Sequence, residues 1–564
     1  MTGTTETSLA ARLARLTPAQ RALLDARVRD LRRATPSLDR IPKRRRPNRN
    51  RLTVDQERIW LIHQFDPTDP VYNVFLGWRL RGDLDVSALE RAVNAVVARH
   101  EALRTTFEVE DLRPVQVIHD EMPITFRRLD LRALPEAERE PEMVRLATEE
   151  IRRPMDITRG PLLRVALIRM AEREHVMVCT IDHLVWDRGS VGIFDREVAE
   201  YYTAFVTGRE PRLPELEIQY ADYAEWQPEW LREEVYRRQL PYWIQQLAGA
   251  PLVLELPTDR PRPPVQTFNG ARYEFRMSAA LTEGIRRLAR AEGVTPNITL
   301  LAAWNLLLYR YTGQRDIVIG TTSSTRSRAQ TEPVIGYFLT MLPLRTTVDP
   351  QMTFRDLLAA TRTTMVGALD HHDMPFGTLL DELRIERDPS RNPVFQVSFI
   401  FVDFHEEPVS LPDLVMEPLV FDNRTAKDDC MLCVFDDPGV ADHYFGLFEY
   451  NTDLFTESTI ARMWRHLEHL LTQVVADPDQ RVQDLSLLDA EDTRTLLVEW
   501  NRTAVPREPE LCLEDLVRRQ AARTPDAVAV VAGDQRLRYA ELVGRAERLA
   551  GYLRARATPS VRRP

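Results

Sequence analysis

The chain has 564 residues, which is enough for more than one domain with a large buried core. Its 44% hydrophobic and 28% charged residues exclude a wholly disordered or fibrous protein. The net charge of −10 and the isoelectric point near 5.7 argue against a general nucleic-acid binder.

Four cysteines in a chain of this length exclude a disulfide framework. Cys430 and Cys433 have a CxxC spacing, but they stand in an apolar run without a second pair or a histidine cluster. We therefore expect a buried strand, with redox or metal binding as the alternatives, and we assign no metal site. We find no signal peptide and no run of about 18 apolar residues, so we expect a cytoplasmic protein without a membrane partner.

In chain order, the leucine spacing of residues 8–33 predicts an amphipathic helix. Residues 35–51 follow as a linker with prolines and a basic cluster, Lys43, Arg44, Arg45, Arg46, Arg49 and Arg51. A charge run of this kind is typical of a solvated tether, and a patch for an acidic partner is the alternative.

The next region mixes strands and helices. Alternation predicts a strand over residues 74–80, and helical spacing predicts helices over 87–99 and 192–205. Residues 162–170 and 175–181 are apolar, β-branched runs joined by a four-residue polar segment, which predicts a hairpin.

A similar order returns after the proline-rich stretch 257–264. Residues 271–277 predict a strand, Ser278 a helix cap, and residues 297–311 a buried helix. Further strands are expected at 316–321 and 394–402, and a helical stripe runs from Ile460 to Val474. Two lobes of similar order indicate a duplicated α+β unit rather than strict βαβ alternation.

After about residue 507 a new segment opens. It predicts helices at 511–521 and 540–554 and strands at 527–531 and 535–539. So short a segment encloses little core, so we interpret it as the beginning of another domain. The expected division is an N-terminal helix and linker, a first lobe, a second lobe, and a linker with this domain start, at 1–50, 51–215, 216–490 and 491–564.

The most informative segment for chemistry is residues 181–190, IDHLVWDRGS. It follows a buried strand and precedes a helix, so the ring of His183 is expected at a surface or cleft. A neutral imidazole near pH 7 accepts a proton or orients an amine, which makes His183 a candidate base. Asp182 and Asp187 flank it and either could orient the ring or form a structural ion pair.

This segment also resembles the motif HHxxxDG of the condensation domains of nonribosomal peptide synthetases. The family's other motifs appear in order, at residues 52–60 (LTVDQERIW), 99–107 (RHEALRTTF), 220–226 (YADYAEW), 335–341 (IGYFLTM), 371–376 (HHDMPF) and 387–393 (RDPSRNP). The C-terminal segment resembles the beginning of an adenylation domain, through residues 537–542 (LRYAEL).

The resemblance implies two chloramphenicol-acetyltransferase-like lobes in a V, with the active site at their junction. It implies peptide-bond formation between a donor thioester and an acceptor amine, each carried on the phosphopantetheine arm of a carrier protein. The partners would be an upstream and a downstream carrier and an adenylation domain. No cofactor would bind the chain directly, and no carrier serine is recognisable in it, so the carriers would come from elsewhere.

By the same pattern His183 is the functional histidine, and Asp187 forms an ion pair with a second-lobe arginine, for which we choose Arg326. The expected channel residues are Trp186, Arg188, Gly189, Ser324, Tyr337 and Thr340.

Three positions depart from the pattern: Asp182 replaces its first histidine, Arg188 its glycine and Thr340 its asparagine. Arg188 could narrow the channel or pair with Asp182. The departures leave open a modified domain that dehydrates or cyclizes a Ser, Thr or Cys residue, and an inactive carrier-docking scaffold.

Overall fold

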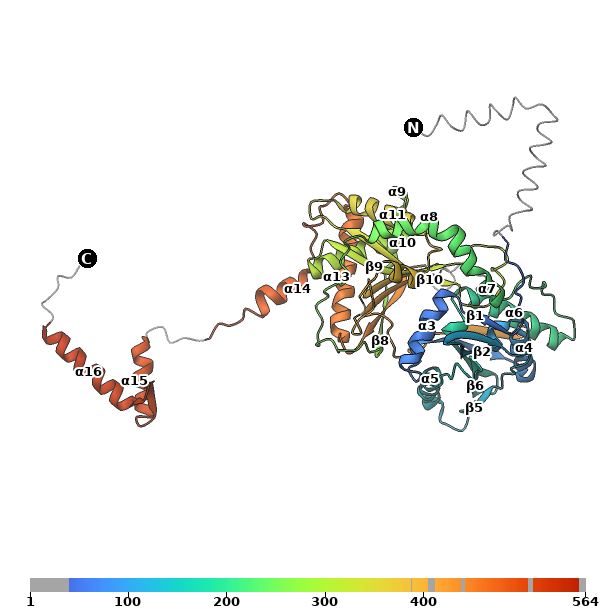
Figure 1. Cartoon of the computed structure of the whole chain (residues 1–564). Helices are drawn as coiled ribbons and strands as arrows, with labels where there is room; N and C mark the ends of the chain where they lie inside the picture. Colours follow the sequence, from blue (N-terminus) through green and yellow to red (C-terminus); the bar gives the residue numbers. More distant parts are fainter. Residues whose placement is uncertain (1–39, 387, 404–410, 438–441, 506–510, 557–564) are drawn as a thin grey trace, which may run out of the picture. The chain divides into compact units, whose positions relative to one another are not determined.

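The computed structural model describes residues 40–386, 388–403, 411–437, 442–505 and 511–556. The chain divides into two compact units, Met1–Leu487 and Leu488–Pro564 (Figure 1). The helix expected at 8–33 lies outside the described residues.

The first lobe is built on a five-stranded sheet. Its strands, in spatial order, are β12 (Leu414–Leu419), β2 (Asn73–Gly82), β7 (Glu174–Asp182), β6 (Leu163–Ala171) and β5 (Arg127–Asp130). The predicted hairpin is confirmed, because β6 and β7 pair antiparallel. Strand β12 comes from the second half of the chain and pairs antiparallel with β2, so the first sheet is completed by a segment expected in the other lobe.

Helices cover both faces of this sheet. They are α3 (Val54–Phe65), α4 (Val86–Arg99), α5 (Glu136–Arg152) and α6 (Gly189–Thr207). Along β7, Met177 and Cys179 enter the main core, whereas Val176 and Val178 enter a smaller core with α5. Burial on both faces explains the unbroken apolar run of this strand.

A small three-stranded sheet, of β1 (Arg49–Arg51), β4 (Arg113–Ile118) and β3 (Thr105–Glu110), sits in the same unit. Strand β1 belongs to the expected tether. Ile41 is buried in the core, and Arg44 forms ion pairs with Glu101 and Asp222, both at 2.9 Å. Residues 40–51 are therefore anchored to the fold at Ile41, Arg44 and β1 and are not a free tether. The other basic residues are exposed, as expected of a solvated charge run: Lys43, Arg45, Arg46, Arg49 and Arg51.

The second lobe has a six-stranded sheet. In spatial order it contains β10 (Leu339–Thr347), β9 (Asp316–Ser324), β11 (Val397–Asp403), β13 (Cys430–Asp436), β14 (Phe445–Asn451) and β8 (Gly270–Arg276). Its helices are α9 (Ala279–Ala291), α10 (Pro296–Thr312), α11 (Phe354–Asp370), α12 (Phe376–Glu382) and α13 (Glu457–Ala476). Helix α7 (Tyr220–Trp230), a π-helical turn (Leu231–Val235) and α8 (Tyr236–Leu247) lead into it from the first lobe.

Cys430 and Cys433 lie on β13, as expected for a buried strand. Residues three apart in a strand point to opposite faces, so the two thiols do not face one site. Burial raises the pKa of the Cys433 thiol to about 12, which keeps it protonated and unreactive.

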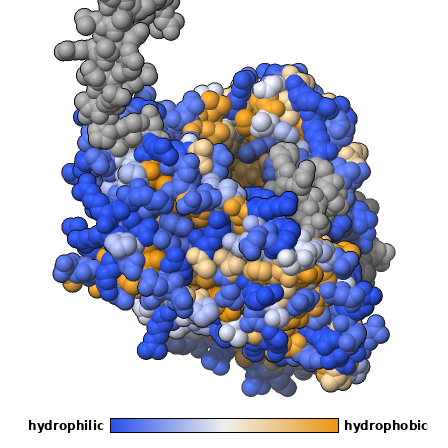
Figure 2. All heavy atoms as spheres, turned by 90° about the vertical axis from the view of Figure 1, so that its right-hand side faces the viewer, coloured by the Kyte–Doolittle hydropathy of each residue, from blue (hydrophilic) through white to orange (hydrophobic). Residues whose placement is uncertain are grey.

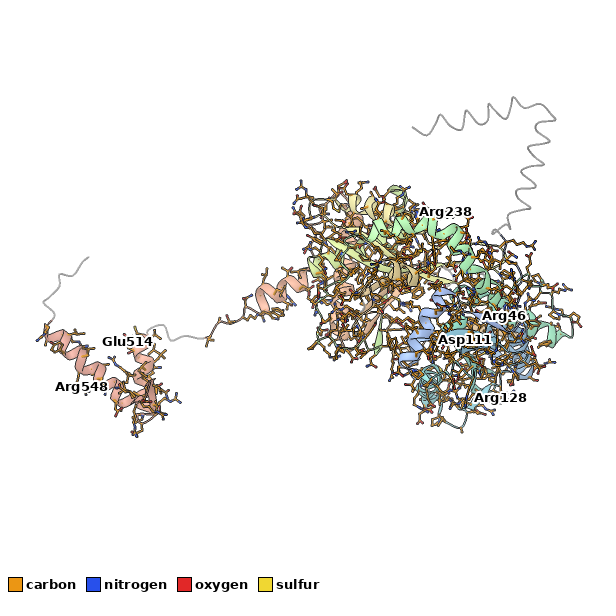
Figure 3. The ribbon with its side chains drawn as sticks, in the orientation of Figure 1. Arg46, Asp111, Arg128, Arg238, Glu514 and Arg548 are labelled. Atoms are coloured by element: carbon orange, nitrogen blue, oxygen red, sulfur yellow. The ribbon has the colours of Figure 1, made fainter. Side chains whose placement is uncertain are left out.

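The C-terminal unit contains α14 (Ala490–Arg494), a π-helical turn (Thr495–Glu499), α15 (Leu513–Arg523), β15 (Val528–Ala532), β16 (Gln535–Arg538) and α16 (Tyr539–Arg556). Glu514 and Arg548 mark α15 and α16 in Figure 3. Neither helix buries a residue, so residues 488–505 and 511–556, which are the described part of this unit, have no core of their own.

Candidate active site

The turn after β7 carries His183. Strand β7 ends at Asp182, whose Oδ1 accepts a hydrogen bond from the Leu184 amide at 2.9 Å and caps the short 3-10 turn His183–Val185. Helix α6 then begins at Gly189. The half-buried His183 side chain thus stands at a strand end, on a turn that hydrogen bonds define.

The His183 ring has a defined tautomer. Its Nδ1 lies 2.6 Å from the carbonyl oxygen of Trp186. Since a carbonyl oxygen only accepts hydrogen bonds, Nδ1 carries the proton and Nε2 presents its lone pair. Burial, together with the charge of Lys427, lowers the pKa of His183 to about 4, so the imidazole is neutral near pH 7.

Two tyrosines enclose this ring. The Tyr337 ring meets it edge-on, with 5.3 Å between centroids, and the Tyr72 ring lies at 6.4 Å. Tyr337 is buried and comes from the second half of the chain, while Tyr72 lies in the first lobe. His183 therefore stands where the two lobes meet.

Asp187 links the lobes through several hydrogen bonds. Arg326, at the end of β9, donates to both carboxylate oxygens, at 2.8 and 3.3 Å. The Phe338 amide donates to Oδ2 at 3.1 Å, and Ser190 donates to Oδ1 through its amide and its hydroxyl. The Arg326 guanidinium also lies 4.3 Å from the Phe338 ring centroid, so the paired charges share a compact, buried setting.

Gly189 allows Arg326 to approach. A Cβ atom at this position would stand 2.7 Å from Arg326 Nε. Arg188, just before it, is exposed and has ordinary helical backbone angles. Ser324 is exposed at the end of β9, and its hydroxyl accepts a hydrogen bond from the Arg326 amide at 3.3 Å.

Trp186 and Thr340, both expected to line the channel, are buried. The Trp186 side chain is fully buried against Phe194 and belongs to the core, so only its carbonyl reaches His183. Thr340 is also buried, and its hydroxyl donates to Asp55 at 3.1 Å. Burial raises the pKa of Asp55 to about 6.

Asp182 has a histidine partner. Its Oδ2 lies 3.1 Å from Nε2 of His63, on α3. Within the described part of the chain this is its ion pair, in place of the Arg188 pair that the sequence suggested. The carboxylate is fully buried and His63 almost so.

Sequence reasoning missed His63, Tyr72 and two cations. Lys427 Nζ lies 5.9 Å from the Tyr72 ring centroid, and the Arg58 guanidinium lies 5.9 Å from that of Phe376. Neither cation forms an ion pair with a described residue. A signal for Lys427 exists, because a charged Lys-Asp-Asp triplet directly precedes the apolar strand β13.

The face of the molecule shown in Figure 2 is hollowed, and hydrophobic side chains edge the hollow. Over the described ranges, no group of three His, Cys, Asp or Glu side chains could hold a metal ion. No helix in the same ranges is long and apolar enough to cross a membrane.

The two lobes and the cross-lobe site define a class of protein, and comparison with known proteins gives the family. The model of the condensation domain family matches residues 48–497. The chain belongs to this family, and its fold is that of two chloramphenicol-acetyltransferase-like lobes of mixed α and β structure.

The chain is similar to segments of much longer synthetases. It is 40% identical over 528 residues to the chondramide synthase of Chondromyces crocatus, covering 93% of this chain and 13% of that protein. It is 39% identical over 554 residues to phosphinothricin tripeptide synthetase PhsC of Streptomyces viridochromogenes, covering 97% of this chain and 50% of the relative.

Solved structures share the fold. The X-domain from teicoplanin biosynthesis, solved in a complex with OxyB, is 31% identical, with a TM-score of 0.72 over 80% of this chain and 98% of that one. A four-domain nonribosomal peptide synthetase, at 22% identity and a TM-score of 0.80, covers 91% of this chain and 39% of its own, and shows the fold alone.

Proposed function

We propose that the chain forms an amide bond between the acyl group of a donor thioester and the amine of an acceptor aminoacyl thioester. Both substrates would arrive on the phosphopantetheine arms of carrier proteins, as membership of the condensation domain family implies. The observation that carries the proposal is the hydrogen bond from His183 Nδ1 to the Trp186 carbonyl. It leaves Nε2 as an acceptor at the junction of the lobes.

In this reaction the imidazole has only to align the amine and to transfer one proton. The acceptor nitrogen attacks the thioester carbon, the C–N bond forms, and the C–S bond then breaks to release a thiolate. A thioester is already activated, so holding two tethered substrates in line supplies much of the acceleration. Since burial lowers the pKa of His183 to about 4, Nε2 aligns the neutral amine. It takes the proton only after bond formation has made the nitrogen acidic, and returns it to the leaving thiolate.

The ammonium group of Lys427 is suited to stabilise the negative charge that develops in this step. The carbonyl oxygen becomes negative in the tetrahedral adduct, and a cation in a partly buried site stabilises it. Lys427 and the His183 ring lie against the same tyrosine, Tyr72. No carboxylate of the described chain neutralises the ammonium group, because the adjacent Asp428 binds Asn392 and Asp429 binds Arg262.

We further propose the division of the chain into lobes at 51–215 and 216–490, with β12 exchanged into the first sheet. Residues 491–564 would begin an adenylation domain. The absence of buried residues in α15 and α16 supports this, because an independent domain would bury part of these helices in its core.

The test is intact-protein mass spectrometry of a donor-loaded and an acceptor-loaded carrier after mixing with this chain. An acceptor carrier that gains the donor acyl mass supports amide formation, and loss of a further water indicates dehydration or cyclization instead. His183→Ala should abolish the product. Near-normal turnover by this variant would remove His183 from the role.

One observation favours a second candidate, a docking scaffold. The X-domain, at 31% identity, was solved in a complex with another protein, OxyB. A scaffold would bind loaded carriers and leave both acyl groups unchanged, so the same mass measurement, combined with a binding assay, separates the two functions.

A further inference from the structure

We propose that His63 and Asp182 are a positioning pair that holds the turn of His183 and keeps net charge away from its ring. The proposal rests on the function assigned to His183 above. It assigns a role to two buried titratable side chains that do not otherwise take part in the reaction.

The pair controls the turn through Leu184, the residue after His183. Asp182 Oδ1 accepts from the Leu184 amide at 2.9 Å. Gln56, on α3, donates to the Leu184 carbonyl at 2.7 Å. Both hydrogen-bonding groups of Leu184 are therefore fixed, one by Asp182 and one by the helix that also carries His63.

Helix α3 reaches the turn at two points of one face. Gln56 and His63 are seven residues apart, which is about two helical turns, so their side chains project to the same side. The second contact is the 3.1 Å approach of His63 Nε2 to Asp182 Oδ2. Asp182 thus uses one oxygen for the turn and the other for α3.

The charges of the pair balance. Burial lowers the pKa of His63, but the carboxylates of Asp182 and Asp69 outweigh it and raise this pKa above its ordinary value. A raised pKa favours the protonated imidazole, which neutralises the buried carboxylate, and the Tyr72 ring lies beside it. A buried carboxylate without such a partner would be costly, and it would favour protonation of the nearby His183.

His183 is sensitive to this balance. Burial and the charge of Lys427 lower the pKa of His183, whereas the hydrogen bond to the Trp186 carbonyl and the charges of Asp187 and Asp182 raise it. The rings of Tyr72 and Tyr337 enclose the imidazole. Asp187 is neutralised by Arg326. His63 performs the corresponding task for Asp182.

The two halves of the pair therefore have opposite expected effects on His183. His63→Gln leaves the Asp182 carboxylate unpaired and should raise the His183 pKa by about one unit. Asp182→Asn keeps the cap on Leu184, leaves no negative charge and should not raise this pKa. The reversed pair His63→Asp with Asp182→His restores neutrality and should bring it back toward the original value.

The experiment uses the full chain and two readouts. The rate of carbethoxylation of His183 by diethyl pyrocarbonate, followed by peptide mass spectrometry across pH, reports its pKa without any turnover. Amide formation from loaded carriers gives kcat and KM. We expect kcat to fall about 10- to 100-fold in His63→Gln, with an unchanged KM. The reversed pair should restore the His183 pKa but not the full kcat, because it lacks the Asp182 cap on Leu184.

A matched control is another buried histidine–carboxylate pair of the first lobe, His100 and Glu197, at 2.8 Å. Glu197→Gln should lower the melting temperature but leave the His183 titration and the kcat per folded molecule unchanged. An unshifted His183 titration in His63→Gln, or the same shift in Glu197→Gln, would overturn the proposal. If even the unmodified chain makes no amide, the proposed function fails while the titration still decides the role of the pair.

Discussion

Asp182 and Asp187 stand on either side of His183, and both are buried, yet they are held in different ways. Asp187 receives hydrogen bonds from Arg326 and Phe338 of the second lobe as well as from Ser190. The contacts of Asp182 described above, with His63 and Leu184, are both within the first lobe. Asp187 thus holds the lobes together, whereas Asp182 fixes the turn within one of them.

The largest expected effect is on the Asp187 side. Asp187→Ala leaves the guanidinium of Arg326, whose side chain is only 10% exposed, without its carboxylate. Breaking a buried pair by removing one partner costs about 3–5 kcal/mol of the free energy of unfolding. Thermal and denaturant unfolding should show this loss, with a smaller change in turnover per folded molecule. A variant that melts normally but is inactive would contradict the structural role.

A smaller effect should follow from crowding the same ion pair. Gly189→Ala would place a methyl group 2.7 Å from Arg326 Nε. Arg326 cannot easily yield, because it also donates to the carbonyls of Thr331 and Val334. We expect a loss of about 1–3 kcal/mol in the free energy of unfolding. Gly551→Ala, in α16 with no atom near the new methyl group, is the matched control and should not destabilise the protein.

The structure also shows which parts of this arrangement a sequence can predict. The hairpin of β6 and β7 follows from two adjacent apolar runs, and the α4 and α13 helices from their spacing, because these patterns are local. Strand β12 was not expected in the first sheet, because its short, half-exposed sequence does not specify a partner as distant as β2. Arg44 shows the same limit, since its carboxylate partners are far along the chain.

The sequence likewise predicts some features of the candidate site and not others. A motif located His183, Asp187 and Arg326, and Asp187 and Arg326 pair in the structure. It did not distinguish side chain from backbone at Trp186, whose ring is in the core while its carbonyl orients His183. Nor did it indicate His63, because a helix residue meets the end of β7 only through the tertiary fold.

The charges that act on His183, among them that of Asp182, can also be tested by substituting Lys427. Burial and, after it, the charge of Lys427 lower the pKa of His183 to about 4. Lys427→Met should therefore move the acid limb of the pH–rate profile upward, but burial should keep it below the ordinary value of 6.5. The direction in which pH changes the free energy of unfolding is also defined. The pKa of His183 is lower in the folded protein than in the unfolded chain, so the protein loses stability as the pH falls from 6.5 toward the folded value. A raised folded pKa makes this loss smaller. Lys427→Arg keeps the charge and should leave the limb in place, and a limb that also stays in place in Lys427→Met would contradict the assignment.

The smallest expected effect belongs to Arg188, which directly follows Asp187. Arg188→Gly restores the residue of the family pattern, but the backbone here has φ −59° and ψ −37°, which any residue adopts. The substitution therefore relieves no strain, and since the side chain is exposed, the free energy of unfolding should change by less than about 1 kcal/mol. If Arg188 narrows the donor channel, Arg188→Gly should raise kcat/KM for a bulky acyl donor more than for a small one. Arg188→Lys, which keeps length and charge, should not, and an equal response to both donors would assign Arg188 to the surface alone.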